Sequence, residues 1–268
     1  MRYGRGAAAL LLLLLALPTA ADEAARTVEL SSLDWPPYIG DSLPAQGFIH
    51  QIAEQALARQ GYRLKVRFLP WARAVEVARE GKSAGVFPEY YEAGRKEEFA
   101  FSDPMPGGPM GFYKRRAADI RFVADPRNDP GTVLQALKGY RFGVVRGYIN
   151  NLAFDVADFL VKEEANSDEL NLKKLAFSRV DLIVIDELVA RHILATRLPE
   201  LADQLEFMRP PLEHKPLYIA FSRQDPQWQA YRDAFNAGLK AMREDGALGR
   251  IMERAGVDMQ VLGKRDEN

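Results

Sequence analysis

Arg95 is the residue whose chemical type and surroundings most directly suggest a function. It lies in the segment 87–104, FPEYYEAGRKEEFAFSDP, between an aromatic-rich stretch and a short apolar one. A guanidinium held beside aromatic rings suits a small zwitterion, because its N–H fork pairs with a carboxylate while the rings cover the apolar part. The segment therefore predicts a binding site for a small polar ligand.

Asp186 is the second candidate for a polar contact with a ligand. It ends the run Asp181-Leu-Ile-Val-Ile-Asp186, whose apolar centre predicts a buried strand. A carboxylate at the end of a buried strand needs a partner, and a ligand's ammonium group would supply one. The alternative is that Asp186 caps a following helix, since Asp is a preferred first residue there. The two roles are compatible.

Two series of strands and helices must position these side chains. The first series is predicted at 28–32 (strand), 48–60 (helix), 64–69 (strand), 71–80 (helix) and 84–87 (strand). The second is predicted at 141–145 (strand), 150–162 and 172–177 (helices), 182–185 (strand) and 187–196 (helix), followed by a strand at 217–221 and helices at 226–244 and 247–255. Such alternation predicts α/β layers with parallel strands, and its repetition predicts two lobes.

The other candidate site residues all follow predicted strands. Trp35, Trp71 and the pair Phe87 and Tyr90 follow the three strands of the first series, and Arg146 and Tyr148 follow the strand at 141–145. Ligands of open α/β sheets gather at the carboxyl ends of strands. We therefore expect these side chains to meet around one cleft.

The N-terminal sequence predicts export. Arg2 and Arg5 are followed by the apolar run 7–17 and by small residues up to Ala21, a pattern typical of a secretory signal peptide over residues 1–21 that is cleaved near Ala21. The apolar run is too short for the alternative, a membrane anchor. The chain has no cysteine, so neither a disulfide nor a lipoprotein anchor is expected, which favours the Gram-negative periplasm.

Composition argues against several other function classes. The net charge is -1 and the basic residues are scattered, so no nucleic-acid partner is expected. No apolar stretch after residue 21 reaches the roughly 18 residues of a membrane helix. Phosphate-loop, nucleophile-elbow and zinc-protease motifs are missing, and the three histidines are isolated in sequence. We expect no metal and no cofactor.

Seven short motifs, in order, resemble those of the bacterial extracellular solute-binding proteins of family 3. These periplasmic binding proteins of type II serve polar amino-acid ABC transporters. The motifs are Trp35-Pro-Pro-Tyr38, Gly47-Phe48, Pro70-Trp71, Gly81-Lys82, Arg95, Phe101-Ser-Asp-Pro104 and the run 181–186. The resemblance implies an α/β, two-lobed Venus-flytrap fold. Lobe 1 would comprise residues 22–111 and 217–268, lobe 2 residues 115–213, and two crossover hinge strands would lie at 110–116 and 212–218.

The resemblance also implies roles for the site residues. Arg95 would clamp the ligand's carboxylate; the alternative is a surface arginine that pairs with Glu97 or Glu98. Asp186 would take the ligand's ammonium group. Trp35 and Trp71 would sandwich the ligand; the alternative for either tryptophan is a core residue. Phe87 would contribute mainly backbone groups.

Two tyrosines depart from the family pattern. Tyr90 lies where many relatives have a threonine that binds the carboxylate, and Tyr148 lies in a turn, 146–150, where relatives often have small residues. The backbone N–H groups of that turn, next to Arg146, would favour an anionic group of the ligand. Both departures bear on which ligand is bound.

The sequence thus predicts a monomeric periplasmic protein, not an enzyme, that captures a small polar ligand, an amino acid or a close analogue, by lobe closure. Its partners would be the membrane subunits of an ABC transporter. One alternative is a lyase or dehydratase-like enzyme on the same fold, with Glu89, Glu92 or Asp186 as general acid. Another is a sensor component that presents its ligand to a receptor.

Overall fold

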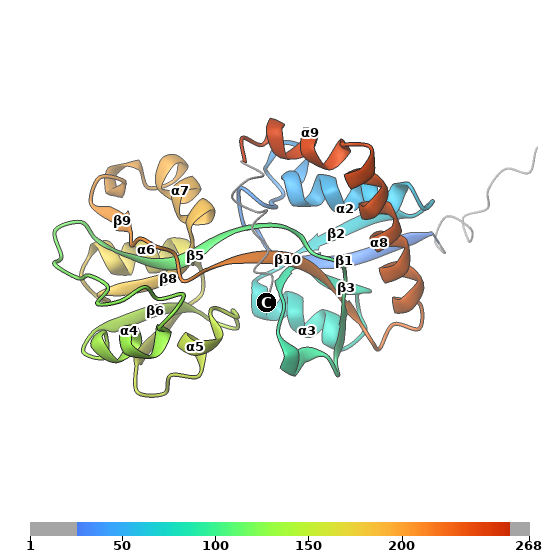
Figure 1. Ribbon diagram of the computed structural model, residues 1–268. Coiled ribbons are helices and arrows are strands. Elements are labelled where there is room, and N and C mark those ends of the chain that lie inside the picture. Colours follow the sequence, from blue (N-terminus) through green and yellow to red (C-terminus); the bar gives the residue numbers. More distant parts are fainter. Residues whose placement is uncertain (1–25, 258–268) are drawn as a thin grey trace, which may run out of the picture.

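The computed structural model describes residues 26–257, which form two α/β lobes (Figure 1). The first lobe contains β1 (Thr27–Ser32), α2 (Phe48–Ala58), β2 (Arg63–Phe68), α3 (Trp71–Arg79), β3 (Gly85–Tyr90), β4 (Phe99–Phe101), α8 (Trp228–Glu244) and α9 (Ala247–Arg254). β1 pairs in parallel with both β2 and β3, which confirms the parallel pairing predicted from the alternation. The predicted signal peptide, residues 1–21, lies outside the described residues.

The second lobe repeats this plan with shorter elements. It contains α4 (Pro130–Ala136), β6 (Arg141–Val145), α5 (Leu152–Asp155), β7 (Val161–Ala165), α6 (Asp168–Ala176), β8 (Leu182–Asp186), α7 (Glu187–Thr196) and β9 (Leu205–Phe207). β6 lies between β7 and β8 and is parallel to both. The carboxyl ends of these three strands therefore lie at one edge of the sheet.

Two long strands, β5 (Met105–Arg115) and β10 (Glu213–Ser222), run between the lobes (Figure 1). β5 pairs with β10 over residues 105–110 and with β8 over residues 110–114. β10 in turn pairs with β3 over residues 217–221. The sheet order β2-β1-β3-β10-β5-β8-β6-β7 is therefore continuous through both lobes.

Helices α2 and α8 pack closely against each other at the core of the first lobe. The buried residues of α2 recur at helical spacing, as the sequence predicted, and include Ile49, Ile52 and Ala53. Gly238 lets α8 approach α2, because a Cβ at this position would collide with the backbone carbonyl of Ala56. No helix among residues 26–257 is long and apolar enough to cross a membrane.

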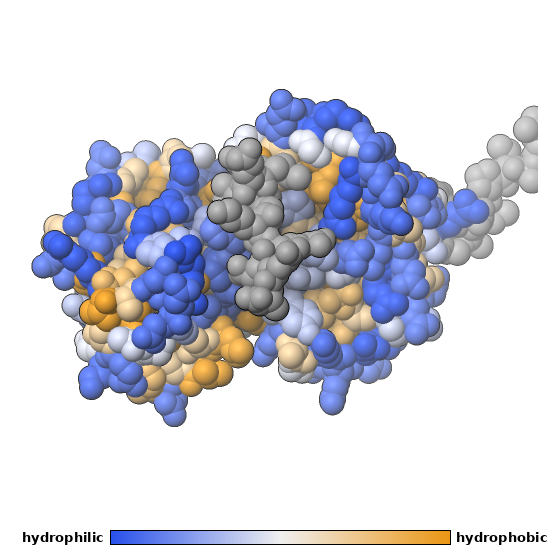
Figure 2. All heavy atoms as spheres, viewed as in Figure 1, coloured by the Kyte–Doolittle hydropathy of each residue, from blue (hydrophilic) through white to orange (hydrophobic). Residues whose placement is uncertain are grey.

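The predicted helix over 150–162 is wrong. Only Leu152–Asp155 is helical, and Val161–Ala165 forms β7, an edge strand paired with β6. The apolar side chains of this segment do not form one buried helical face: Phe154 and Leu160 are buried, but Leu152 is 72% and Val156 69% exposed. Figure 2 shows apolar side chains gathered on the surface of the second lobe near α5. The helix predicted at 172–177 in fact begins at Asp168.

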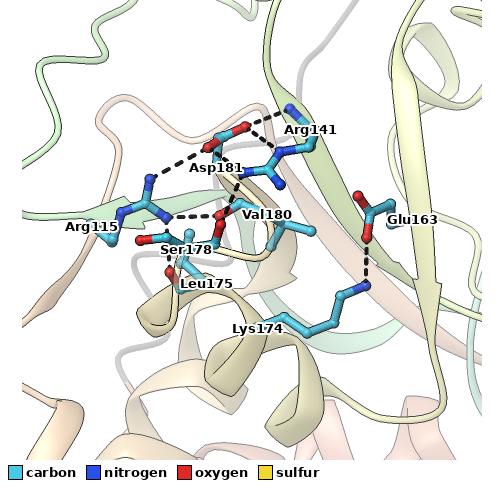
Figure 3. A network of polar contacts seen from close by, with 8 residues as sticks. All are labelled: Arg115, Arg141, Glu163, Lys174, Leu175, Ser178, Val180 and Asp181. Carbon is cyan, nitrogen blue, oxygen red and sulfur yellow. Dashed lines mark hydrogen bonds and ion pairs between the residues drawn. The ribbon is translucent and has the colours of Figure 1, made fainter.

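An ion-pair network fixes the amino-terminal end of β8 (Figure 3). Asp181 accepts hydrogen bonds from the backbone N–H and the guanidinium of Arg141 and from the guanidinium of Arg115. Arg115 also donates to the carbonyls of Leu175 and Val180. The network ties the ends of β5, β6 and α6 to the start of β8, and so fixes the strand that carries Asp186 at its other end.

Candidate ligand-binding site

Asp186 ends β8 and caps α7. Its Oδ1 accepts hydrogen bonds from the backbone N–H groups of Leu188 and Val189, at 2.8 and 3.2 Å, so the capping role is confirmed. Its Oδ2 accepts from the hydroxyls of Tyr38 and Tyr90, at 2.9 and 3.4 Å. Burial raises the pKa of Asp186 to about 7, although the hydrogen bonds from Tyr38 and the α7 backbone act in the opposite direction.

Gly108 on β5 makes room for the bond between Tyr38 and Asp186. A Cβ at this position would collide with the Tyr38 hydroxyl and would lie 2.7 Å from the Asp186 Oδ2 atom. Glycine is therefore required here by close approach rather than by backbone conformation.

Asp168 is a second buried carboxylate, at the start of α6. Its Oδ2 accepts hydrogen bonds from the Trp35 indole N–H and the Tyr148 hydroxyl, both at 3.1 Å. Burial raises the pKa of Asp168 to about 6, against the effect of these two bonds. The tyrosine hydroxyls on both carboxylates have pKa values raised well above their ordinary value by burial, so they remain donors.

Three of these hydrogen bonds join the two lobes. Trp35, Tyr38 and Tyr90 belong to the loop and strand ends of the first lobe, whereas both aspartates belong to the second. Trp71 of the first lobe donates its indole N–H to the carbonyl of Gly147 in the second, at 3.0 Å. An ion pair between Asp34 and Arg197, at 2.8 Å, adds a further contact between the lobes. The lobes are therefore closed on each other.

Four aromatic rings surround a cavity between the lobes. The ring of Trp35 makes edge contacts with those of Tyr90 and Tyr148, with interplanar angles of 82° and 85°. Tyr148 also meets Trp71 at 89°. The four rings, together with Leu33, Pro88, Glu89, Ile149 and Leu217, line a small cavity of about 20 Å³, which we call the aromatic cavity. A wider hollow of about 460 Å³ shares Trp35, Trp71 and Tyr148 with it and extends along α6 and α7.

Glu89 is the acidic group in the wall of the aromatic cavity. Its Oε2 lies 2.6 Å from Nη1 of Arg95, and its Oε1 accepts a hydrogen bond from the backbone N–H of Tyr90 at 3.0 Å. Burial raises the pKa of Glu89 to about 7, and the nearby Arg95 guanidinium acts in the opposite direction. Glu92 also pairs with Arg95, at 3.4 Å. The alternative partners considered for this arginine, Glu97 and Glu98, were therefore wrong.

Comparison with known proteins identifies the family. The sequence profile of the bacterial extracellular solute-binding proteins, family 3, matches residues 31–257. The chain belongs to this family. No protein with a curated function matches it.

Solved structures show the same fold in other binding proteins. An ancestral arginine-binding protein bound to arginine has a TM-score of 0.70 at 19% identity, with 85% of this chain and 97% of that chain covered. The substrate-binding protein of an amino-acid ABC transporter has a TM-score of 0.69 at 16% identity, with 85% and 98% covered. A histidine kinase sensor domain similar to periplasmic binding proteins has a TM-score of 0.72 at 16% identity, with 85% and 95% covered. The two-lobed periplasmic-binding fold predicted from the sequence is thus confirmed.

The sequence-predicted residues of this solute-binding protein divide into two groups. Four of the five predicted aromatic residues, Trp35, Trp71, Tyr90 and Tyr148, line the aromatic cavity, and Asp186 accepts a hydrogen bond from the Tyr90 hydroxyl. The other predicted contacts lie elsewhere: Arg95 pairs with glutamates, Arg146 is exposed and pairs with Glu164, and buried Phe87 accepts a hydrogen bond from Ser32 through its carbonyl. Ligand contacts by the second group stay predictions.

Sequence reasoning missed Asp168 and gave Tyr38 no polar role. Asp168 follows β7, whose first two residues had been assigned to the helix 150–162 and whose strand was not predicted, so Asp168 was not placed at a strand end. A signal was present, because Ser167 is a preferred helix-capping residue and the acidic pair Asp168 and Glu169 suits a first helical turn. No sequence signal predicts that Tyr38 reaches Asp186, since the two residues belong to different lobes.

Proposed function

We propose that this protein captures a small polar solute bearing an amine between its two lobes in the periplasm, and delivers it to a membrane transporter of the ABC type. The observation that carries the proposal is the pair of buried carboxylates, Asp168 and Asp186. Each accepts hydrogen bonds from aromatic side chains of the opposite lobe, beside the aromatic cavity. Contacts of this kind exist only when the lobes are together, so they favour the closed state.

In this proposal, lobe 1 (residues 22–111 and 217–268) and lobe 2 (residues 115–213) move about hinge segments at 110–116 and 212–218. The path of β5 and β10 from one lobe to the other supports this division. A solute enters the open cleft against Trp35 and Trp71, and closure brings Tyr148 and Asp186 toward it. Amino acids and close analogues are the first class to test, because two of the neighbouring structures are of amino-acid binding proteins.

We propose binding without turnover. Two of the groups considered as general acids, Glu89 and Asp186, are buried, and their pKa values are raised to about 7. Such groups are able to donate protons near neutral pH, so the enzyme alternative deserves a direct control. The family and the neighbouring structures are those of binding proteins, which supports the simpler function.

The test is a ligand screen on the mature protein, residues 22–268, against α-amino acids, amines, small dicarboxylates and short peptides. Thermal shift is the first readout, since a ligand at 100 times its dissociation constant stabilises the folded state by about 2.7 kcal/mol. Small-angle scattering of each hit reports closure, and NMR of the recovered solute reports turnover. A saturable hit that stays chemically unchanged supports the proposal. Silence in all four classes, or a converted solute, contradicts it.

A further inference from the structure

Tyr148 lies between two spaces of the closed cleft. The aromatic cavity, at about 20 Å³, has room for one water molecule, whereas the wider hollow has about 460 Å³. Four residues line both spaces and therefore separate them: Leu33, Trp35, Trp71 and Tyr148. The first three belong to the first lobe, and Tyr148 belongs to the second. Closure of the lobes is therefore what places the Tyr148 ring against the two tryptophans.

The backbone around Tyr148 is fixed by a tight turn. The Tyr148 N–H donates to the carbonyl of Val145, the last residue of β6, at 3.1 Å. Gly147 within this turn has a φ of 78°, a left-handed conformation that glycine adopts without a steric penalty. The Trp71 indole N–H bonds to the Gly147 carbonyl at 3.0 Å and so ties the turn to the first lobe. These contacts set the position from which the Tyr148 side chain enters the cleft.

The Tyr148 ring is held by groups of both lobes. Its hydroxyl donates to the buried Asp168 at 3.1 Å, and its centre lies 6.4 Å from that of the Trp35 ring and 6.1 Å from that of the Trp71 ring. Edge-to-face pairs of this kind attract each other beyond the effect of the area that they bury. A solute side chain can lie between the two tryptophans only if it displaces this ring or holds the lobes apart. Either change removes contacts that favour the closed state.

The wider hollow accommodates a compact solute without such a displacement. Its volume falls within the range of about 300–1,000 Å³ that is usual for small-molecule sites. Its lining includes Asp168, one of the two carboxylates on which the proposed function rests. On the other side of Tyr148, the aromatic cavity is bounded by Glu89 and Tyr90 and has no room for a larger group. Tyr148 therefore marks how far a solute can extend from the hollow.

We propose that Tyr148 determines the specificity of the cleft, because its ring restricts the solute to a compact molecule and excludes a large side chain from the space between Trp35 and Trp71. The inference rests on the proposed function and narrows it by the size of the solute. Among amine-bearing solutes, α-amino acids with small side chains, such as alanine, fit the closed cleft, and those with large apolar side chains do not.

Calorimetric titration of residues 22–268 with alanine, leucine and phenylalanine tests this inference. We expect the wild type to bind alanine at least tenfold more tightly than leucine or phenylalanine. Tyr148→Ser joins the two spaces, so the ratio of leucine affinity to alanine affinity should rise at least tenfold. Tyr148→Phe loses the hydroxyl but keeps the ring, and should keep the wild-type ratio within threefold. A wild type that binds leucine as tightly as alanine overturns the inference, and so does an unchanged ratio in Tyr148→Ser or an equal change in Tyr148→Phe.

Tyr140 offers a matched control in the same lobe. It precedes β6, at the opposite end of that strand from Tyr148, packs half-buried against the core and lines neither space. Tyr140→Ser removes the same atoms without reaching the cleft, so we expect a lower melting temperature and an unchanged affinity ratio. A ratio that rises as much as in Tyr148→Ser would assign the effect to a loosened lobe and overturn the inference. Far-ultraviolet circular dichroism checks the folding of every variant.

Tryptophan fluorescence supplies a readout at the two indole rings. The chain has three tryptophans, and Trp228 lies on α8 outside both spaces, so emission in the background Trp228→Phe reports Trp35 and Trp71. Without solute, acrylamide should quench this emission more strongly in Tyr148→Ser than in the wild type, and leucine should reduce the quenching in that variant. Equal quenching in the two proteins would show that the ring does not cover the tryptophans, and would overturn the inference.

Failure of the size limit can be told apart from failure of the proposed function. If amino acids of all sizes bind the wild type with equal affinity, or if only another amine of the wider screen binds, the inference fails while the proposed function stands. If no member of the wider screen binds, both fail.

Discussion

The two ends of β8 carry aspartates in opposite environments. Asp181, at the start, accepts hydrogen bonds from two arginines (Figure 3), and the bonds from Arg141 lower its pKa. Asp186, at the end, accepts only from tyrosine hydroxyls and backbone N–H groups, and burial raises its pKa to about 7. The protein itself therefore supplies the positive charge next to Asp181, whose role is structural. In the cleft, we propose that the bound solute supplies the positive charge next to Asp186.

The Glu89–Arg95 pair should show the largest effect, because it is the one buried carboxylate of the cavity with a charged protein partner. Arg95→Met leaves Glu89 buried and unpaired, which should lower the free energy of unfolding by about 3–5 kcal/mol at pH 8. The double variant Arg95→Met/Glu89→Gln should regain much of this loss. Chemical denaturation measures both, and a double variant no more stable than the single one would contradict the pairing.

The same double variant tests the carboxylate clamp predicted for Arg95. It removes one positive and one negative charge together and leaves Asp168 and Asp186 in place, so we expect the affinity for an amine-bearing solute to fall by less than tenfold. If Arg95 clamps a ligand carboxylate instead, the double variant should abolish binding of whichever zwitterion the screen identifies.

Neutralising each aspartate of β8 separates their roles. Asp186→Asn should weaken binding of the amine-bearing solute by about 2–5 kcal/mol, the range typical of removing one partner of a buried charge pair, with little change in stability because Asn also caps helices well. The matched control Asp181→Asn should leave affinity unchanged and lower the free energy of unfolding by about 1–3 kcal/mol, since bonds to charged groups are lost. Titration calorimetry and denaturation of both variants measure this. A loss of affinity in Asp181→Asn, together with a loss of stability in Asp186→Asn, would contradict the different roles proposed for the two aspartates.

The sequence predicted the parts of the fold that depend on local pattern. The parallel strands β1, β2 and β3, the strand β8 and its helix α7 all follow from apolar runs and spacing. β7 was missed because its Val-Lys-Glu-Glu-Ala sequence has little apolar content and its pairing with β6 is non-local. Once β7 was missed, Asp168 at its carboxyl end was missed as well.

The site was predictable only in part for a similar reason. Aromatic residues after strand ends identify the cavity, and Trp35, Trp71, Tyr90 and Tyr148 all line it. Their partners belong to the opposite lobe: Trp35 bonds to a residue 133 positions away, and Tyr38 to one 148 positions away. The closure of the lobes decides these pairings, and no spacing in the sequence encodes them.

Stability should depend on pH through the cleft carboxyl groups. The pKa values of Asp168, Asp186 and Glu89 are raised on folding to between about 6 and about 7, so the folded state binds more protons than the unfolded state. The stabilisation that these groups contribute is fully present below the pKa values of the unfolded state, and it is lost as pH rises toward 7. His50 and His192 act in the opposite sense, because burial lowers their pKa values.

The difference between wild type and Asp186→Asn isolates this contribution. We expect the melting temperature of the ligand-free wild type to fall relative to that of the variant as pH rises from 5 to 8. Parallel curves would contradict the raised pKa of Asp186.

Proton exchange on binding is the most direct test of the charge in the cleft. Calorimetric titration at pH 6.5 with the amine-bearing solute that the ligand screen identifies, in two buffers of different ionisation enthalpy, gives the number of protons exchanged. A bound cation favours the ionised carboxylates, so we expect protons to be released, and fewer of them in Asp186→Asn. Proton uptake, or no proton exchange in the wild type, would contradict the proposal that the cleft carboxylates bind a cationic group of the solute.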